Sequence, residues 1–82
     1  MTARVTLYTR VGCHLCEQAR EVVAQVCADL DESFDEVDVD SSAELQEAYT
    51  EQVPVTLVDG RRHDFWRVDE ARLRAALARP AT

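Results

Sequence analysis

Two cysteines separated by two residues are the part of this sequence with the clearest chemistry. Cys13 and Cys16 stand directly before and within a predicted helix. The first turn of a helix has unpaired backbone N–H groups and the positive end of the helix dipole, and both favour a thiolate. A thiol three residues later lies one turn inside the helix, close enough to attack a mixed disulfide formed on the first. This spacing predicts thiol–disulfide exchange, with Cys13 as nucleophile and Cys16 as resolving thiol.

A structural zinc site is one alternative use of these cysteines. Zinc in such sites normally takes four ligands, which usually come from two paired clusters. Outside the pair the chain has no second CxxC, and its other sulfur and imidazole side chains are His14, Cys27 and His63. Cys27 lies about 16 Å beyond Cys16 along one helix, too far for a disulfide, so we expect a small core side chain there. The pattern favours redox chemistry without a metal or an organic cofactor.

The elements that must position the pair follow from the spacing of apolar residues. Residues 5–8 alternate as a strand, and a helix is predicted from Cys13 to about Asp29. The apolar residues of this helix recur at three- and four-residue spacing, which predicts one buried face: Leu15, Ala19, Val22, Val23, Val26, Cys27 and Leu30.

The middle of the chain is acidic. Residues 34–39 are interpreted as an edge strand, since charge discourages pairing between sheet edges. Ser41 and Glu44 fit a capping box at the start of a short helix, with Ser41 as N-cap. We expect Tyr49, near the end of that helix, in the core.

The last third predicts a hairpin and a helix. Residues 55–58 and 61–66 flank Asp59-Gly60, a favoured two-residue turn, and His63 is expected at the surface. Asp69 is predicted to cap the last helix, which packs through Leu73, Ala76 and Leu77. The order β-α-β-α-β-β-α predicts an α/β fold with one mixed four-stranded sheet flanked by helices.

Length and charge limit the function classes. The 82 residues are enough for one domain, which we place at residues 1–79 with a short tail at 80–82. The net charge of −7 argues against a nucleic-acid groove, because phosphate binding needs a cationic surface. No apolar run fits a signal peptide or a membrane span. We therefore expect a cytoplasmic monomer that binds neither nucleic acid nor membranes.

The residues around the cysteines also resemble a known family. Residues 5–16 and the helix that follows resemble the start of glutaredoxins, and Val53-Pro54 before a strand resembles their cis-proline segment. The resemblance runs from about Val5 to Leu77 and is closest to bacterial glutaredoxin-like proteins with a GCHLC-type motif. It implies a thioredoxin-like fold in which Val53 and Pro54 line the site opposite the cysteines.

The resemblance further implies a dithiol–disulfide oxidoreductase. Its substrate would be a disulfide-bearing protein or a low-molecular-weight thiol, and an external reductase or thiol reductant would restore the dithiol. The alternative is a non-catalytic redox-sensor or binding module that keeps the same scaffold.

Two features bear on the partner thiol. The Gly-Gly pair with which glutaredoxins hold glutathione is absent, and Phe65-Trp66 stands near that place, which predicts weak or no glutathione-dependent activity. Every basic residue is Arg, and Lys, Ile and Asn are absent, a bias typical of GC-rich bacteria, some of which use mycothiol. Trp66 is a candidate lining residue, with packing as its alternative role.

Three polar residues near the motif are further candidates for binding. As a cation, His14 could stabilise the Cys13 thiolate, or it could stand exposed in the loop; both interpretations remain open. Arg10, beside the motif, and Arg67 could each bind a substrate carboxylate.

Overall fold

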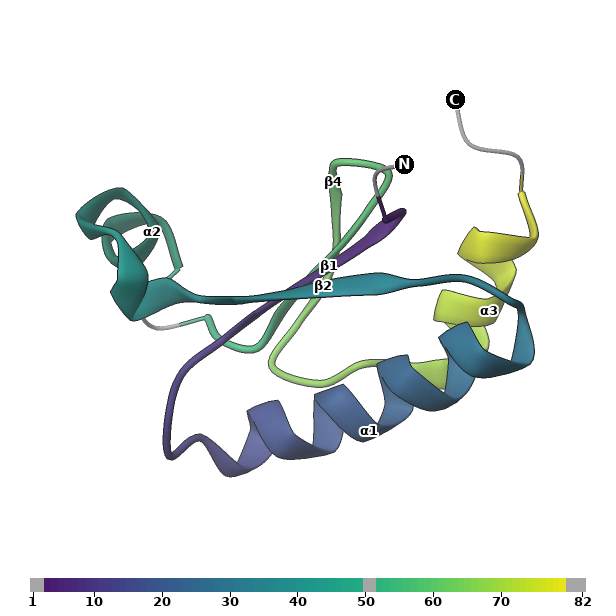
Figure 1. Ribbon diagram of the computed structural model, residues 1–82, viewed down its shortest axis with the longest axis horizontal. Helices are drawn as coiled ribbons and strands as arrows, with labels where there is room; N and C mark the ends of the chain where they lie inside the picture. The colour runs from purple at the N-terminus through teal and green to yellow at the C-terminus, as the bar shows by residue number, and fades with distance from the viewer. Residues whose placement is uncertain (1–2, 50–51, 80–82) are drawn as a thin grey trace.

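The computed structural model describes residues 3–49 and 52–79, and these form the strands and helices in the predicted order (Figure 1). In chain order they are β1 Val5–Thr9, α1 His14–Asp29, β2 Phe34–Asp38, the 3₁₀ turn η1 Val39–Ser41, α2 Ala43–Tyr49, β3 Val55–Val58, β4 Arg61–Phe65 and α3 Glu70–Ala78. The prediction of an α/β fold with a mixed sheet is confirmed.

The four strands form one sheet in the order β2-β1-β3-β4. β1 pairs in parallel with β2 and antiparallel with β3, which in turn pairs antiparallel with β4. Tyr8 at the end of β1 lies opposite Val55 at the start of β3, and Val55 lies opposite Phe65 at the end of β4. The segments that follow β1 and β4 and the segment that precedes β3 therefore meet at one end of the sheet.

The core lies between one face of the sheet and helices α1 and α3. Val5 and Leu7 of β1 are fully buried there, since alternate residues of a strand point to the same face. They pack with residues from both helices, namely Ala19, Val23, Val26, Cys27, Leu73 and Leu77. Tyr8 points to the opposite face, where its ring stacks on Tyr49 of α2 at a centroid distance of 4.7 Å. α2 lies away from α1 and α3, beyond the end of β2 (Figure 1).

Helix α1 confirms the predicted buried face except at its end. The helix ends at Asp29, and Leu30 is the residue after it. Leu30 is 38% exposed because the chain leaves the helical path there, and Asp31 has a positive φ of 55°. The prediction that Leu30 extends the buried stripe is therefore wrong.

The acidic strand is an edge strand, as predicted, but it is shorter than expected. β2 ends at Asp38, whose side chain accepts a hydrogen bond from the backbone N–H of Asp40 at 2.9 Å and starts the 3₁₀ turn. The cap of α2 is shifted by one residue, since Ser42 Oγ accepts from the N–H of Leu45 at 3.3 Å. Ser41 instead donates to the Asp38 carbonyl, so the predicted capping box is wrong.

Two further predictions on burial are wrong. Tyr49 is half-buried and belongs to the aromatic stack with Tyr8, because no residue of α2 reaches the core. His63 is predicted to lie at the surface, but its side chain is only 12% exposed and lines a cavity that Ala76 and Arg79 of the α3 region also line. The tail at 80–82 lies outside the described residues. Within the described ranges, no helix is long and apolar enough to span a bilayer.

Candidate active site

The CxxC pair lies where α1 begins, at the end of the sheet where β1 stops. The turn before it contains Gly12, whose φ of 81° is a conformation that glycine adopts without strain. The backbone N–H of Cys13 donates to the carbonyl of Arg10 at 3.3 Å and closes this turn. The chain thus enters the helix directly from the sheet, and the prediction that the helix opens at Cys13 is confirmed.

Cys13 is the N-cap of α1. Its Sγ accepts a hydrogen bond from the backbone N–H of Cys16 at 3.1 Å, in the place where a serine or aspartate oxygen usually accepts. Cys13 is partly exposed, so its thiol is open to solvent. An N–H group of the first helical turn therefore donates to the sulfur that is partly open to solvent.

Cys16 has the opposite environment. It is 1% exposed, and burial, followed by its hydrogen bond with Cys13, raises its pKa to about 12. A thiol with this pKa is protonated at neutral pH. Both cysteines are free thiols in the structure. The Cys13 sulfur is thus accessible at the helix cap, whereas the Cys16 thiol is buried and protonated one turn further into the helix.

His14 and Arg10 are turned to other partners. The His14 side chain is 94% exposed, and its Nδ1 lies 3.9 Å from the carboxylate of Glu17. Arg10 Nε donates to Asp40 Oδ2 at 3.1 Å, so its guanidinium already faces a carboxylate. His14 is therefore exposed, and its role toward the Cys13 thiolate stays a prediction.

The Val53-Pro54 peptide bond is cis, as the family resemblance implies. Pro54 is buried and Val53 half-buried, directly before β3. The carbonyl of Pro54 accepts a hydrogen bond from the backbone N–H of Trp66 at 2.7 Å. This bond joins the proline segment to the segment after β4, so Pro54 and Trp66 are brought together at the cysteine end of the sheet.

A small groove of about 130 Å³ runs beside the start of α1. It is lined by Leu15, Gln18, Ala19, Val22 and the segment 66–68. Trp66 is 52% exposed and has a φ of 65°, the left-handed region that glycine favours. Phe65 is 48% exposed and its ring meets the Trp66 ring edge-on at 5.1 Å. The indole of Trp66 thus lines this groove, and the Phe65 ring contacts the indole.

Sequence reasoning missed some of the groove residues. Gln18 and Val22 follow Leu15 at three- and seven-residue spacing, so they share the helix face that begins beside the cysteines. That spacing is a usable signal, but a polar residue such as Gln18 in an amphipathic helix is normally interpreted as a solvent-facing side chain. Arg67, which the sequence suggests as a ligand for a substrate carboxylate, lines this groove.

The third cysteine and the second histidine are not part of this site. Cys27 is 3% exposed within the core, where burial raises the pKa of its thiol. The prediction of a small core side chain at Cys27 is confirmed. His63 lines a cavity with the hairpin turn, at the other end of the sheet. Across the described ranges, no three His, Cys, Asp or Glu side chains are grouped so that they could hold a metal ion.

The fold and the CxxC at a helix start define a thioredoxin-like protein. A glutaredoxin (grx-1) from Archaeoglobus fulgidus has the same fold, with a TM-score of 0.64 at 16% identity over 93% of this chain and 87% of that chain. The family model described as "Glutaredoxin-like domain (DUF836)" matches residues 4–78. The chain therefore belongs to this glutaredoxin-like family.

Nearer relatives share much more sequence. The protein XcR50 from X. campestris, solved by X-ray crystallography, is 45% identical with a TM-score of 0.75, and the match covers 93% of this chain and 99% of that chain. The uncharacterized protein Rv0508 from Mycobacterium tuberculosis is 40% identical over 93% of this chain and 84% of its own length. The chain thus spans most of the length of these relatives.

Proposed function

We propose that this protein is a dithiol–disulfide oxidoreductase, with Cys13 as attacking and Cys16 as resolving thiol. The observation that supports it is the asymmetry of the pair. Cys13 is accessible at the helix cap and accepts an N–H hydrogen bond, whereas Cys16 is buried behind it with a pKa raised to about 12. The attacking group of such a pair needs access and a stabilised negative charge, and the resolving group needs neither until a mixed disulfide has formed.

The first step is attack of the Cys13 thiolate on one sulfur of the substrate disulfide. The substrate S–S bond breaks, a Cys13–substrate disulfide forms, and the departing sulfur leaves as a thiolate. The N–H of Cys16, 3.1 Å from Cys13 Sγ, stabilises the charge on the attacking sulfur before this step.

The second step uses Cys16. Its thiol gives up a proton, for which the departed substrate thiolate is an acceptor, and its sulfur attacks Cys13 Sγ. The mixed disulfide breaks, the second substrate thiolate leaves and takes up a proton from solvent, and a Cys13–Cys16 disulfide remains. Two electrons and two protons from an external dithiol, or from two monothiols, then restore both cysteines.

The surface around the pair supports a protein substrate. Val11 is 87% exposed, and Phe65 and Trp66 are about half exposed at the same end of the sheet. In the described part of the chain, the remaining large apolar side chain with such exposure is Leu30. The Phe65 and Trp66 rings contact each other, and adjacent exposed apolar side chains are typical of a contact surface. The substrate would pack on these side chains while its disulfide reaches Cys13.

The same side chains argue against glutathione as the reductant. Trp66 holds a left-handed backbone conformation and adds an indole ring where a glycine would leave the groove open. Of the two arginines that could hold a carboxylate of the tripeptide, Arg10 is already paired with Asp40, and Arg67 lies in the groove that the indole narrows. We therefore propose reduction by a thioredoxin-reductase-type system or by another low-molecular-weight thiol such as mycothiol.

A coupled assay tests both parts of the proposal. Reduction of insulin disulfides is followed with three reductants in parallel: glutathione with its reductase, a thioredoxin-reductase system, and mycothiol. We expect saturable turnover with one of the last two, none with Cys13→Ser, and trapped mixed disulfides with Cys16→Ser. Cys27→Ala, which removes the third cysteine, should keep the activity.

The assay separates the two claims. Robust turnover with glutathione would reject the claim on the reductant and leave the cysteine roles standing. Turnover that survives Cys13→Ser would reject those roles. No turnover with any reductant, together with a reversible Cys13–Cys16 disulfide, would favour the sensor module.

A further inference from the structure

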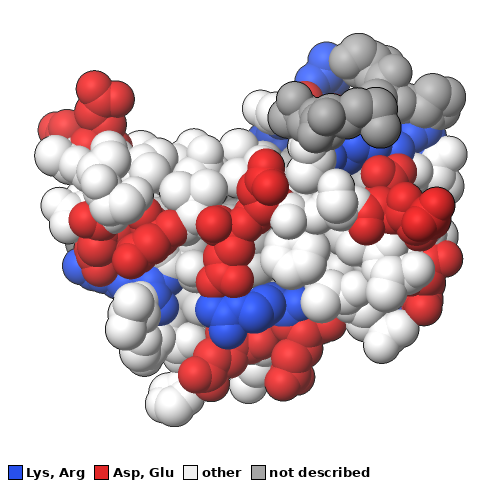
Figure 2. Space-filling model, in the orientation of Figure 1, with Lys and Arg blue, Asp and Glu red and all other residues white. Residues whose placement is uncertain are grey.

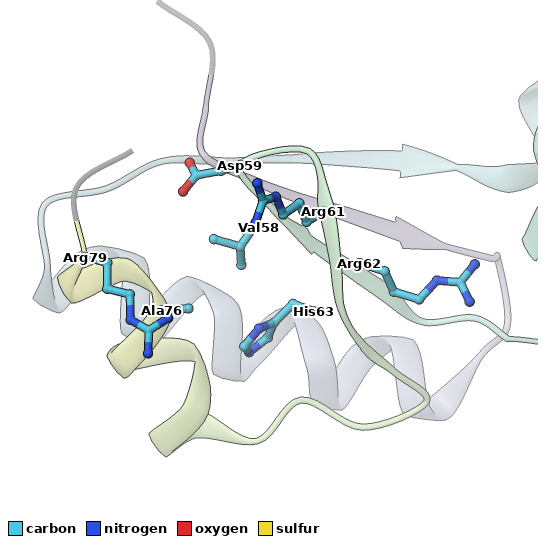
Figure 3. A pocket seen from close by; sticks show the side chains of 7 residues that line it. All are labelled: Val58, Asp59, Arg61, Arg62, His63, Ala76 and Arg79. Carbon is cyan, nitrogen blue, oxygen red and sulfur yellow. The ribbon is translucent and has the colours of Figure 1, made fainter. Parts of the chain in front are cut away.

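A second cavity lies at the end of the sheet away from the cysteines. It has a volume of about 520 Å³ and opens between the β3–β4 hairpin and the end of α3 (Figure 3). Val58 and Ala76 form apolar parts of its wall, and Arg61, Arg79 and His63 are polar residues of the lining. The volume is within the range of small-molecule sites. No residue of this cavity belongs to the cysteine site.

The charge of the cavity is positive, although the chain as a whole carries −7. Its one lining carboxylate, Asp59, already has a partner, because the guanidinium of Arg4 donates to both Asp59 oxygens at 2.9 Å and also to Glu32 at 3.2 Å. Acidic side chains are spread over the face of the molecule in Figure 2, with arginines between them. An anion would therefore be attracted to this cavity more than to the acidic surface elsewhere.

Two arginines of the cavity form no salt bridge with a carboxylate in the described structure, although the charge of Arg61 acts on Asp59 and helps to lower its pKa. Five other arginines each form at least one salt bridge with Asp or Glu: Arg4, Arg10, Arg20, Arg72 and Arg74. Among the described residues, no salt bridge or hydrogen bond involves the guanidinium of Arg61 or Arg79. Arg62 points away from the cavity, and its guanidinium lies over the Tyr49 ring at 5.8 Å (Figure 3). The N–H groups of Arg61 and Arg79 therefore have no protein acceptor among the described residues and can donate to a ligand.

His63 provides an independent observation. Its side chain is only 12% exposed, and its Nε2 is buried without a hydrogen-bond partner in the described structure. The nearest carboxylate oxygen, Asp64 Oδ2, is 3.7 Å away and already accepts the N–H of Asp69. The imidazole projects from β4 toward Ala76 and Arg79 (Figure 3). Buried polar atoms are normally hydrogen-bonded, so His63 Nε2 could form its hydrogen bond with a ligand atom in the cavity.

We propose that this cavity binds a small organic anion. Arg61 and Arg79 would hold its phosphate or carboxylate group, for which a guanidinium is well suited, and His63 would donate a hydrogen bond to it. The apolar part of the ligand would pack on Val58 and Ala76. The site is separate from the cysteines, so an anion can bind while thiol exchange proceeds.

The test is a titration of the full, ¹⁵N-labelled chain followed by its amide NMR shifts. Three ligands share one ring and differ in the group attached to it: phenyl phosphate, benzoate and neutral phenol, all at constant ionic strength set with chloride. We expect saturable shifts at residues 58–63 and 76–79 with at least one anion, and none with phenol. The anion that binds more tightly identifies the head group as phosphate or carboxylate.

Variants assign the binding to the arginines. Arg61→Gln with Arg79→Gln should weaken binding by about tenfold or more, as expected for the loss of charge-assisted hydrogen bonds. Arg67→Gln removes an exposed arginine outside the cavity and should leave the affinity unchanged. Both arginines are exposed, so the double variant should stay folded and its amide spectrum should remain well dispersed. Absence of saturation with both anions, binding that survives the double variant, or shifts only near Cys13 would overturn the proposal.

Discussion

At the hairpin end of the sheet, one largely buried arginine joins four segments, whereas the ion pair beside the cysteine motif is much more exposed. Arg4, only 16% exposed in its side chain, donates to Asp59, to Glu32 and to the carbonyls of Leu77 and Arg79. It thus ties β1 to the hairpin turn, to the start of β2 and to the end of α3.

The cysteine end is built differently. The proline segment and the segment after β4 are joined by the N–H of Trp66 and the carbonyl of Pro54, at 2.7 Å. The Arg10–Asp40 ion pair is 42% and 35% exposed, so solvent screens it. We infer that the hairpin end contributes more to holding the fold together, while the cysteine end leaves side chains open for a partner.

The largest effect should distinguish the cysteines themselves. At pH 8 we expect iodoacetamide to modify Cys13 at least about 100-fold faster than Cys16, because a thiol with a pKa of about 12 is almost wholly protonated at that pH. Cys27, also buried with a raised pKa, serves as the internal control and should also react more slowly than Cys13. Peptide mass spectrometry measures all three rates in one sample. Preferential alkylation of Cys16 would reverse the assigned roles.

A smaller effect is expected at Trp66. Trp66→Gly should raise glutathione-dependent turnover several-fold, because it removes the indole and places a glycine at a φ of 65°. Trp66→Phe keeps a bulky ring and should show no gain. Steady-state kcat/KM with glutathione and its reductase is the measurement. Equal values for the two variants would show that the ring does not exclude glutathione.

The contrast between the two ends can be tested by stability. Arg4→Met should lower Tm by roughly 5 °C or more, because it leaves carboxylates and carbonyls at the hairpin end without their shared donor. Arg10→Met removes one exposed ion pair at the cysteine end and should change Tm by no more than about 2 °C. Thermal unfolding followed by circular dichroism gives both values. Similar losses for the two variants would contradict the inferred difference.

The smallest expected effect is a pH dependence of the Arg4→Met loss. The hydrogen bond from Arg4 lowers the pKa of Asp59 from its usual 3.8. Stability from a lowered pKa is fully present above the unfolded value and is lost as pH falls through the folded value. The difference in Tm between wild type and variant should therefore be constant from neutral pH down to about pH 5 and shrink below 3.8.

The control for the pH series is Arg67→Met, which removes an exposed arginine at the other end of the sheet. Its Tm difference from wild type should not change in the same way with pH. A constant Arg4→Met difference down to pH 3 would show that the carbonyl hydrogen bonds, and not the Asp59 carboxylate, carry the effect of Arg4.

Local signals in the sequence were sufficient for most of the elements. Asp69 accepts the N–H of Arg72 at 3.1 Å as the predicted cap, and Asp59-Gly60 forms the hairpin turn with φ values of 53° and 81°. These features depend on a few neighbouring residues. The errors at Ser41 and Leu30 are shifts at element ends, where neighbouring polar or apolar residues compete for the same role.

The sequence by itself determined that a CxxC pair starts the first long helix, that the order of elements requires one mixed sheet, and that a proline segment precedes its third strand. Tertiary structure decided which thiol is buried, because the exposure of Cys16 depends on what packs over the first turn of α1. It also decided that Arg4 joins segments up to 75 residues away and that the His63 side chain is largely buried beside a cavity. Burial and long-range pairing depend on residues distant in sequence, and no local pattern contains them.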